Sequence, residues 1–340
     1  MATQLMRVES RLRAVATTHN ARLTELTLHG LEAGGKRLRP ALVVSSAIAV
    51  GGHEAVSERV IDAATAVELL HLASLYHDDV LDSAATRRGR PSANALWGNH
   101  AAILGGDVLL AHAYRVAAEL GACELRRFAH TLAALCSGQI AECATHFDVS
   151  RELAQYDESI RGKTAALLAT SCWLGASTAG ATPAAAEAIA GFGMELGVTF
   201  QIVDDVLDLY GCGLQIGKPS GSDLRAGVFT LPVLLTLRDD PSLVELLVEG
   251  IDERGVAEVA ARVHAAGADQ RALGLALDHL QIAFANLGDP SLLPEGVAML
   301  LAIGELVLEP LERLGLEIRS RPAHAPAHQD NRIQPEVQAA

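Results

Sequence analysis

The feature that most constrains this chain is an acidic pattern, Asp-Asp-x-x-Asp, which occurs twice among apolar residues. The first copy ends segment 68–82, which contains neither Gly nor Pro. Its apolar residues recur at steps of three and four, which predicts a helix. Residues four apart share a helix face, so Asp78 and Asp82 lie together, while Asp79 points about 100° away.

The second copy lies far along the chain, with Asp204 and Asp208 on one predicted helix face and Asp205 off it. Neighbouring carboxylates repel each other and persist when cations are close. We therefore predict two facing helices with a cation cluster between them. Oxygen ligands without nearby Cys favour Mg²⁺ shared with substrate phosphates. The alternative, acidic helix ends exposed to solvent, is weaker for two copies than for one. The candidate metal ligands are Asp78, Asp82, Asp204 and Asp208.

Basic segments accompany both acidic copies. Segment 34–40, Gly-Gly-Lys-Arg-Leu-Arg-Pro, resembles a phosphate cradle before a helix. It also overlaps the spacing of a nucleotide P-loop, but Arg37 occupies the Ser/Thr position and no strand precedes it. Three arginines, at 87, 88 and 90, follow the first acidic copy.

Two further segments carry weaker signals. Gly162 weakens a predicted helix beside Lys163 and Thr164, and a Gly-rich loop after residue 210 carries Lys218 as a lid. For all these basic segments, solvated loops, a surface lysine and mutual salt bridges remain alternatives.

Composition limits the fold and the partners. Hydrophobic residues make up 50% of the 340 residues but aromatics only 4%, so the core must consist of Ala, Leu and Val in close-packed helices. A net charge of −14 argues against nucleic acid and anionic membranes as partners. Five Cys without CxxC spacing, and no signal peptide, indicate a cytoplasmic protein. No uninterrupted apolar run reaches the ~18 residues of a transmembrane segment.

The periodicity predicts an all-α chain with no strand-like alternation. We expect one domain over 1–319 and a disordered tail over 320–340, which is poor in apolar residues. Helical patterns cover 3–29, 41–50, 54–82, 93–147, 151–179, 183–210 and 230–316.

Taken together, these motifs resemble the trans-isoprenyl diphosphate synthases, the polyprenyl synthetase family, over residues 30 to 235. The resemblance implies a bundle of antiparallel helices around a deep central cavity, usually a homodimer. It implies Mg²⁺-dependent head-to-tail condensation of isopentenyl diphosphate with an allylic diphosphate, with three ions in each active site. The matching positions are Gly34 to Pro40, His71, Asp78 to Asp82, Arg87, Arg88, Lys163, Thr164, Phe200, Gln201, Asp204 to Asp208, Gly217 and Lys218.

The same resemblance assigns roles to individual residues. Those implied to hold isopentenyl diphosphate are Lys36, Arg39, His71 and Arg88. Those implied to surround the allylic diphosphate are Arg87, Lys163, Thr164, Gln201 and Lys218. Lys163, Thr164 and Gln201 are also the implied catalytic residues, because their oxygens would stabilise the allylic cation left after ionisation. Asp208 would act on the metal through water.

The sequence departs from the family pattern at two positions. In Gly227-Val-Phe-Thr-Leu-Pro232, Val228 stands where the family usually has a lysine, which removes one phosphate contact. Cys212 replaces an acidic residue after the second motif. Neither position is a metal ligand, so we expect activity with weaker allylic binding.

Small side chains near the first motif suggest a long product. Ala73 and Ser74 precede Asp78 and leave the predicted chain pocket open, so we expect products of twenty carbons or more. A bulky residue deeper in the pocket, such as Leu70 or one within 101–114, would instead favour a short product of ten to fifteen carbons. The motifs are also compatible with a class I terpene cyclase, a metal-dependent phosphohydrolase or a regulatory subunit of a heteromeric synthase.

Overall fold

The computed structural model describes residues 1–210 and 220–313, and its fold is all-α, as predicted. Lys218, Cys212 and the predicted tail over 320–340 lie outside the described residues. The helices are α1 (Ala2–Ala16), α2 (Ala21–Glu32), α3 (Leu38–Gly51), α4 (Glu58–Leu81), α5 (Ala93–Trp97), α6 (Asn99–Leu120), α7 (Ala122–Cys143), α8 (Leu153–Ile160), α9 (Ala166–Thr178), α10 (Pro183–Tyr210), α12 (Ser222–Ala226), α13 (Leu231–Asp239), α14 (Glu253–Ala265), α15 (Ala268–Ala285), α16 (Pro294–Leu306) and α17 (Glu309–Arg313). Shorter elements are the 3₁₀ helices η1 (His53–Ala55) and η3 (Pro241–Leu246), the π-helical turn η2 (Arg161–Ala165), and the strands β1 (Thr86–Arg87) and β2 (Arg90–Pro91).

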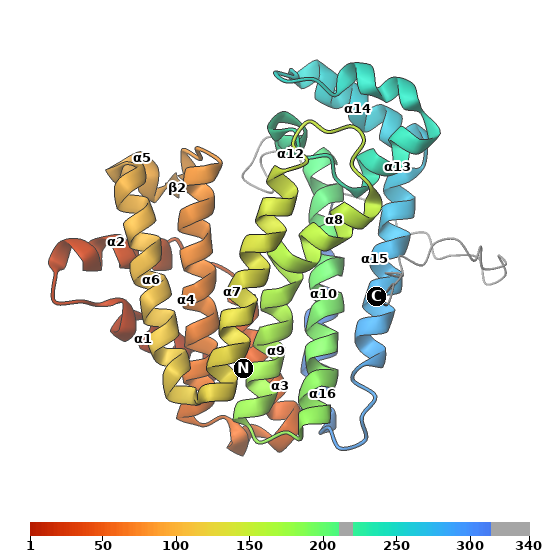
Figure 1. The fold of residues 1–340 in the computed structure, drawn as a ribbon. Coiled ribbons are helices and arrows are strands. Elements are labelled where there is room, and N and C mark those ends of the chain that lie inside the picture. The colour runs from red at the N-terminus through yellow and green to blue at the C-terminus, as the bar shows by residue number, and fades with distance from the viewer. Residues whose placement is uncertain (211–219, 314–340) are drawn as a thin grey trace, which may run out of the picture.

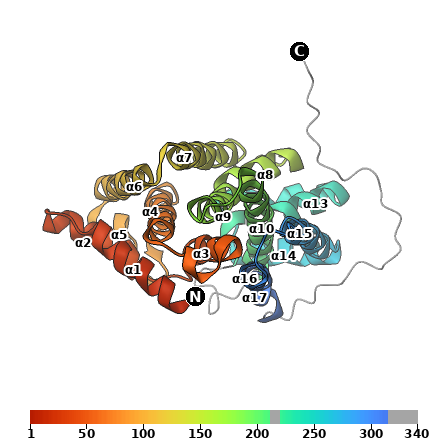
Figure 2. The same cartoon turned by 90° about the horizontal axis from the view of Figure 1, so that it is seen from below.

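The long helices run side by side and form a bundle (Figure 1). Seen along the helices, α4, α9 and α10 lie inside, between the row of α6, α7 and α8 and the helices α1, α3 and α16 (Figure 2). Helix α9 packs against both α4 and α10, so the two helices that carry the acidic motifs flank a common neighbour. Both motifs lie at the C-terminal ends of their helices, at the same end of the bundle (Figure 1).

The inner helix α9 carries no charged residue, as expected for a buried helix. In α9, residues 167–176 are all buried. Glycines let helix backbones approach closely: a Cβ on Gly193 of α10 would lie 2.6 Å from the carbonyl oxygen of Leu168 in α9. The predicted close packing of an Ala- and Leu-rich core is therefore confirmed.

Two of the long helical segments predicted from the sequence are divided into shorter helices, at a capping residue in one and at glycines in the other. The segment 3–29 forms α1 and α2, because the Asn20 side chain accepts hydrogen bonds from the backbone of Arg22 and Leu23 and starts a new helix. The segment 93–147 divides into three helices at Gly98 and Gly121, whose φ angles of 82° and 135° end helical geometry.

The prediction of a chain without strands was wrong in one detail. The arginine-rich turn after Asp82 forms a two-residue antiparallel ladder, in which Thr86 pairs with Pro91 and Arg87 with Arg90. This hairpin turns the chain back over the end of α4, which positions Arg87 and Arg88 beside the first acidic motif.

Helices α6 and α10 are each long and apolar enough, by length and composition alone, to cross a membrane. Core helices of globular proteins also meet these criteria. In α10, 61% of the most apolar window is buried inside the bundle, and α6 packs along α4.

Candidate active site

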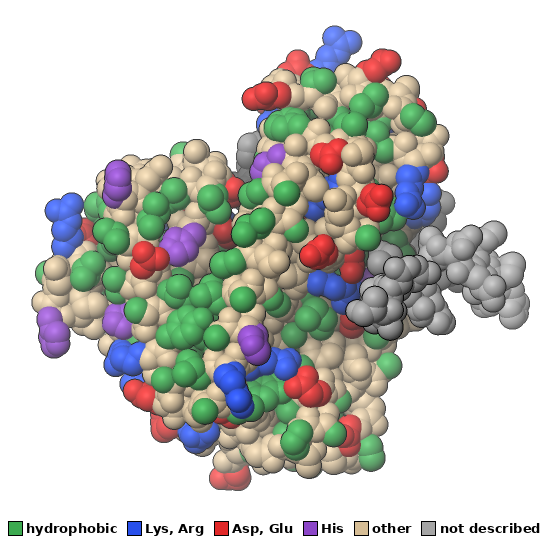
Figure 3. All heavy atoms as spheres, viewed as in Figure 1, with side chains coloured by type: hydrophobic (Ala, Val, Ile, Leu, Met, Phe, Trp, Pro, Cys, Tyr) green, Lys and Arg blue, Asp and Glu red, His purple; other side chains and the backbone are tan. Residues whose placement is uncertain are grey.

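Both acidic motifs face one polar cavity of about 200 Å³. Asp78 from α4, Asp82 directly after it and Asp204 from α10 line it together, so the predicted meeting of the two motifs is observed. A notch in the surface separates the end of α4 from the α12 region (Figure 3). The remaining lining residues are Arg87, Gln139, Glu142, Arg151, Tyr156, Ile160, Lys163, Gln201, Asp205, Asp223, Val228 and Thr230.

A second, larger cavity of about 450 Å³ adjoins the first and is mainly apolar. Its walls include Leu70, Leu110, Leu132, Leu135 and Leu167 from helices α4, α6, α7 and α9. Both cavities are lined by the same three side chains, Asp78, Gln139 and Lys163. The acidic space therefore leads directly into an apolar space within the bundle.

At the first motif, adjacent aspartates have different environments. Burial raises the pKa of Asp78, the charge of nearby Asp82 raises it further, and Lys163 opposes the rise. A bound cation would restore the charged form of Asp78. Asp79 is buried instead, and its Oδ1 accepts a 2.8 Å hydrogen bond from Nε of Arg87. Arg87, assigned to the allylic diphosphate, therefore lines the cavity while paired with a carboxylate.

The second motif repeats this division. Asp204 is exposed to the cavity, whereas Asp205 is buried, and its oxygens accept hydrogen bonds from Tyr156 Oη (2.6 Å) and Gln201 Nε2 (2.9 Å). Burial raises the pKa of Asp205 to about 7, although both hydrogen bonds lower it. The carboxylate of Asp208 accepts hydrogen bonds from the backbone nitrogens of Ser222 (3.2 Å) and Asp223 (3.1 Å). The structure thus places Asp208 under the start of α12.

Lys163 and Thr164 lie in the π-helical turn η2, at the position where Gly162 weakens the predicted helix. A Cβ on Gly162 would lie 2.7 Å from the carbonyl oxygen of Ala134, so glycine permits α7 to pack against the turn. A π-helical turn holds more residues than an α-helical turn, so it changes the directions of the side chains that follow. Both Lys163 and Thr164 line the apolar cavity. The expected distortion at Gly162 is therefore present.

Thr164 and Gln201 form a hydrogen-bonded chain along the cavity wall. Thr164 Oγ1 donates to Gln201 Oε1 over 2.7 Å, and Gln201 donates onward to Asp205. Thr164 lines the apolar cavity, and Gln201 lines the polar one. These two predicted catalytic residues are thus held in one fixed orientation.

A second basic group lies on the α3–α4 side. Arg39 and His71 line the apolar cavity, and Arg39 Nε is buried without a hydrogen-bond partner. Burial and then the charges of Arg39 and Arg88 lower the pKa of His71 far below its usual value, so its imidazole is neutral. Such a cluster is suited to an anion. Arg88 donates to the carbonyl of Gly34, which joins the hairpin to the Gly-rich loop.

The remaining cations of the Gly-rich loop have other environments. Arg37 is directed inward, where it pairs with the buried Glu68 (2.7 Å) and with Glu9 (3.0 Å). Lys36 is exposed in the loop next to Gly35, whose added Cβ would lie 2.5 Å from Arg88. The loop therefore places Lys36 near Arg88 without placing it in either cavity wall.

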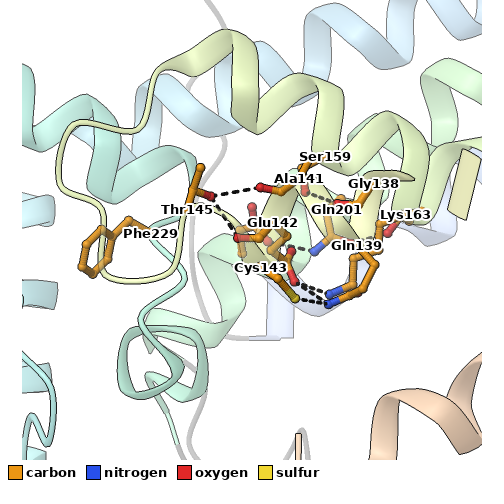
Figure 4. A network of polar contacts seen from close by, with 12 residues as sticks. Gly138, Gln139, Ala141, Glu142, Cys143, Thr145, Ser159, Lys163, Gln201 and Phe229 are labelled. Atoms are coloured by element: carbon orange, nitrogen blue, oxygen red, sulfur yellow. Dashed lines mark hydrogen bonds and ion pairs between the residues drawn. The ribbon is translucent and has the colours of Figure 1, made fainter. Parts of the chain in front are cut away.

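Sequence reasoning missed two polar residues of α7. Glu142 Oε1 pairs with Lys163 Nζ at 2.6 Å and also accepts from Gln139 Nε2 at 3.4 Å (Figure 4). Gln139 and Glu142 are three residues apart and so share one helix face. This spacing is the sequence feature from which both residues could have been predicted as part of the site. The charge of Glu142 and its hydrogen bond outweigh burial and raise the pKa of Lys163.

The donor set fits Mg²⁺ shared with a ligand. Among residues 1–210 and 220–313, no three His, Cys, Asp or Glu side chains are grouped closely enough to hold a metal alone. Asp78, Asp82 and Asp204 nevertheless line one cavity with oxygen donors only, and phosphate oxygens would complete the coordination of a hard cation.

Comparison with known proteins decides the family. Residues 20–265 match the polyprenyl synthetase family. The chain belongs to the polyprenyl synthetase family. It is 41% identical to heptaprenyl diphosphate synthase component 2 of Geobacillus stearothermophilus over 78% of this chain and 82% of that protein. It is 35% identical to chloroplastic solanesyl-diphosphate synthase 2 of Oryza sativa over 84% of this chain and 72% of that protein.

Solved structures agree with this assignment. A polyprenyl synthase from Caulobacter crescentus, crystallised with calcium and isoprenyl diphosphate, is 31% identical and superposes with a TM-score of 0.84 over 90% of this chain and 94% of that one. As a member of this family, the protein is a transferase that acts on isoprenyl diphosphates and uses Mg²⁺.

Proposed function

We propose that the protein condenses isopentenyl diphosphate with an allylic diphosphate, head to tail, and makes trans-polyprenyl diphosphates of twenty carbons or more. The observation that carries this proposal is the junction of the two cavities at Asp78, Gln139 and Lys163. A diphosphate in the polar cavity would have its hydrocarbon chain in the apolar one. Long-chain products also agree with the heptaprenyl and solanesyl names of the relatives.

Each wall has a role in this reaction. Asp78, Asp82 and Asp204 would hold Mg²⁺, with Asp208 acting through water, and we propose three ions per site. The metal, when bound, neutralises negative charge on the departing diphosphate. Lys163 adds a fixed positive charge beside that group, and Lys218 is proposed to do the same. Apolar walls exclude water from the allylic cation.

The second substrate would bind on the α3–α4 side. The proposed isopentenyl diphosphate site consists of Lys36, Arg39, His71 and Arg88. The Nε of Arg39 has no hydrogen-bond partner, and His71 is neutral. Thr164 and Gln201 would present oxygen lone pairs toward the allylic cation. A terpene cyclase needs no second diphosphate site, so these residues favour condensation over cyclisation.

Product length depends on the apolar cavity. Ala73 and Ser74 both line it, and neither side chain fills it. Leu70 and Leu110, from the regions expected to close a short pocket, form part of the wall around a volume of about 450 Å³. We therefore retain the proposal of twenty carbons or more over the short-chain alternative.

We also propose a homodimer formed by one catalytic domain spanning residues 1–319 of each chain. Exposed apolar side chains gather over α6 and α7, visible as hydrophobic atoms in Figure 3. They include Ile103 (41% exposed), Leu104 (60%) and Ile140 (69%). The name of the Geobacillus relative, component 2, favours a second candidate, one subunit of a heteromeric synthase. We place the enzyme in the cytoplasm, where the free thiols of Cys123, Cys136 and Cys143 stay reduced.

A Mg²⁺-dependent assay with labelled isopentenyl diphosphate tests the function. Primers of five, ten, fifteen and twenty carbons are supplied in turn, and products are separated by chain length. We expect elongation past fifteen carbons, loss of activity with a chelator and at least about 100-fold loss in Asp204→Asn, which removes a charge-stabilising group. Turnover of an allylic primer alone would instead indicate a cyclase. Activity only after a partner is added would indicate the heteromer, and light scattering of the pure protein tests the dimer.

A further inference from the structure

Arg151 is a buried arginine at the wall of the polar cavity, in the loop between α7 and α8. Only 5% of its surface is exposed. Its Nη1 donates a 3.0 Å hydrogen bond to the carbonyl of Phe229, and its guanidinium lies 5.6 Å from the ring centre of Tyr156. The other two nitrogens, Nε and Nη2, are buried without a hydrogen-bond partner.

Arg151 differs in this respect from the other basic residues of the cavity. Arg87 is paired with Asp79, and Lys163 is paired with Glu142. Among the basic side chains that line this cavity in residues 1–210 and 220–313, Arg151 alone has no carboxylate within ion-pair distance. Guanidinium nitrogens form a fork of donors that fits two oxygens of a phosphate group.

An alternative role for Arg151 would be to neutralise nearby acids. Burial lowers its pKa, while the charges of Glu142 and Asp205 raise it. Both acids, however, have closer partners: Glu142 pairs with Lys163, and Asp205 accepts from Tyr156 and Gln201. Nε and Nη2 of Arg151 therefore have no acceptor within the described residues, in a side chain that lines the cavity.

The position of Val228 indicates what the positive charge of Arg151 could contribute to anion binding in this cavity. Val228 lines the same cavity, one residue before the carbonyl that Arg151 contacts. The two loops are joined a second time, because the Phe147 backbone nitrogen donates to the Gly227 carbonyl over 2.8 Å. The same loops are seen side by side at Thr145 and Phe229 (Figure 4). An isopropyl group at 228 offers no donor to an anion, whereas Arg151 offers two.

We propose that Arg151 binds the diphosphate of the allylic substrate through Nε and Nη2, and supplies the positive charge that Val228 does not. This inference rests on the proposed function, because it takes the polar cavity as the allylic diphosphate site. It identifies a substrate-binding residue on the loop before α8, far in the sequence from Arg87, which lines the same cavity.

The test uses inorganic pyrophosphate with Mg²⁺ as the probe, titrated calorimetrically into the full-length protein. Arg151→Gln is expected to weaken pyrophosphate binding about 10-fold or more, as for a lost hydrogen-bonded charge. The matched control is Arg127→Gln, because Arg127 also stacks on an aromatic ring, Trp173 at 5.2 Å, but does not line either cavity. The control should bind pyrophosphate as the wild type does.

Kinetics add a readout that a purely structural role would not produce. In Arg151→Gln, KM for the allylic substrate should rise about 10-fold, while KM for isopentenyl diphosphate stays within about twofold. Adding Val228→Lys to Arg151→Gln should recover most of the lost pyrophosphate affinity. If Arg151→Gln does not fold, Arg151→Lys replaces it, with a smaller expected loss because the charge is kept and the fork is lost.

Pyrophosphate affinity within twofold of the wild type, in whichever of these variants folds, would overturn the proposal. So would equal increases in KM for both substrates. A wild-type protein that binds pyrophosphate through Arg151 but does not condense the two substrates would refute the proposed function and still support this residue assignment.

Discussion

The hydroxyl of Tyr156 donates a 2.6 Å hydrogen bond to Oδ2 of Asp205, and both residues are buried. This bond joins α8 to α10 directly beside the exposed Asp204. Gln201 connects the same carboxylate to Thr164 in the π-helical turn. The orientation of the cavity wall therefore depends on one buried acid, and four predictions concern this wall and its surroundings.

Replacing Tyr156 with Phe should lower the free energy of unfolding by about 1–3 kcal/mol, because Asp205 loses a buried hydrogen-bond donor. Urea unfolding followed by circular dichroism measures the change. Tyr114→Phe is the control, since the Tyr114 ring packs edge-on against Phe128 and its hydroxyl is not part of this network. Equal stabilities of the two variants would contradict the assigned role.

Asp205 should make stability depend on pH. Its pKa is raised to about 7, so between its unfolded value of ~4 and this raised value the native state binds a proton that the unfolded state lacks. This contribution to the free energy of unfolding is largest at low pH and falls as pH rises to 7. Asp205→Asn removes the titration, so the stability of the variant relative to the wild type should increase by a few kcal/mol from pH 5 to pH 8, at about 1.4 kcal/mol per pKa unit. Urea unfolding at the two pH values measures it, and a relative stability that does not change with pH would show that Asp205 is charged throughout.

Gly138→Ala should destabilise the fold, because the new Cβ would lie 2.7 Å from the Ser159 carbonyl oxygen and would also meet the Lys163 backbone nitrogen. Overpacking of this kind typically costs about 1–3 kcal/mol. The matched control is Gly274→Ala in α15, where an added Cβ meets nothing within 4 Å. That variant should be stabilised by up to about 1 kcal/mol, since alanine favours helices over glycine. Thermal unfolding compares them, and similar melting temperatures would argue against a tight contact.

Ser74→Phe should shorten the product. A phenyl ring at this position would project into the apolar cavity that Ser74 lines, and would block growth of the chain beyond it. We expect the main product to become shorter by at least one five-carbon unit, measured by mass spectrometry after dephosphorylation. Ser74→Ala is the control and should leave the product distribution unchanged. An unaltered distribution in Ser74→Phe would mean that the chain grows along another wall.

The acidic motifs could be found from the sequence because their spacing matches the helix repeat. That repeat alone distinguished Asp78 and Asp204 from Asp79 and Asp205, and in the structure the latter pair is buried and hydrogen-bonded to Arg87 and Tyr156. The division of 3–29 was missed even though Asn20 carries a capping signal. The helical periodicity of the whole segment favoured one continuous helix over a break at that single residue.

Other site residues had little local signal. Arg151 is one basic residue in a short loop, and only the packing of that loop against Phe229 brings it to the cavity. Arg37 shows the opposite error, because a basic cluster suggested phosphate binding for a side chain that is directed toward Glu68. Which member of a charged cluster points inward is determined by tertiary packing, which the sequence does not display.

The three residues shared by the two cavities differ from the residues that line the apolar cavity alone. Asp78, Gln139 and Lys163 stand where bond breaking would begin, whereas Ala73, Leu110 and Leu132 contact only the space that receives the hydrocarbon. Substitutions in the second group would therefore be expected to change the space for the hydrocarbon while leaving the side chains at the junction in place.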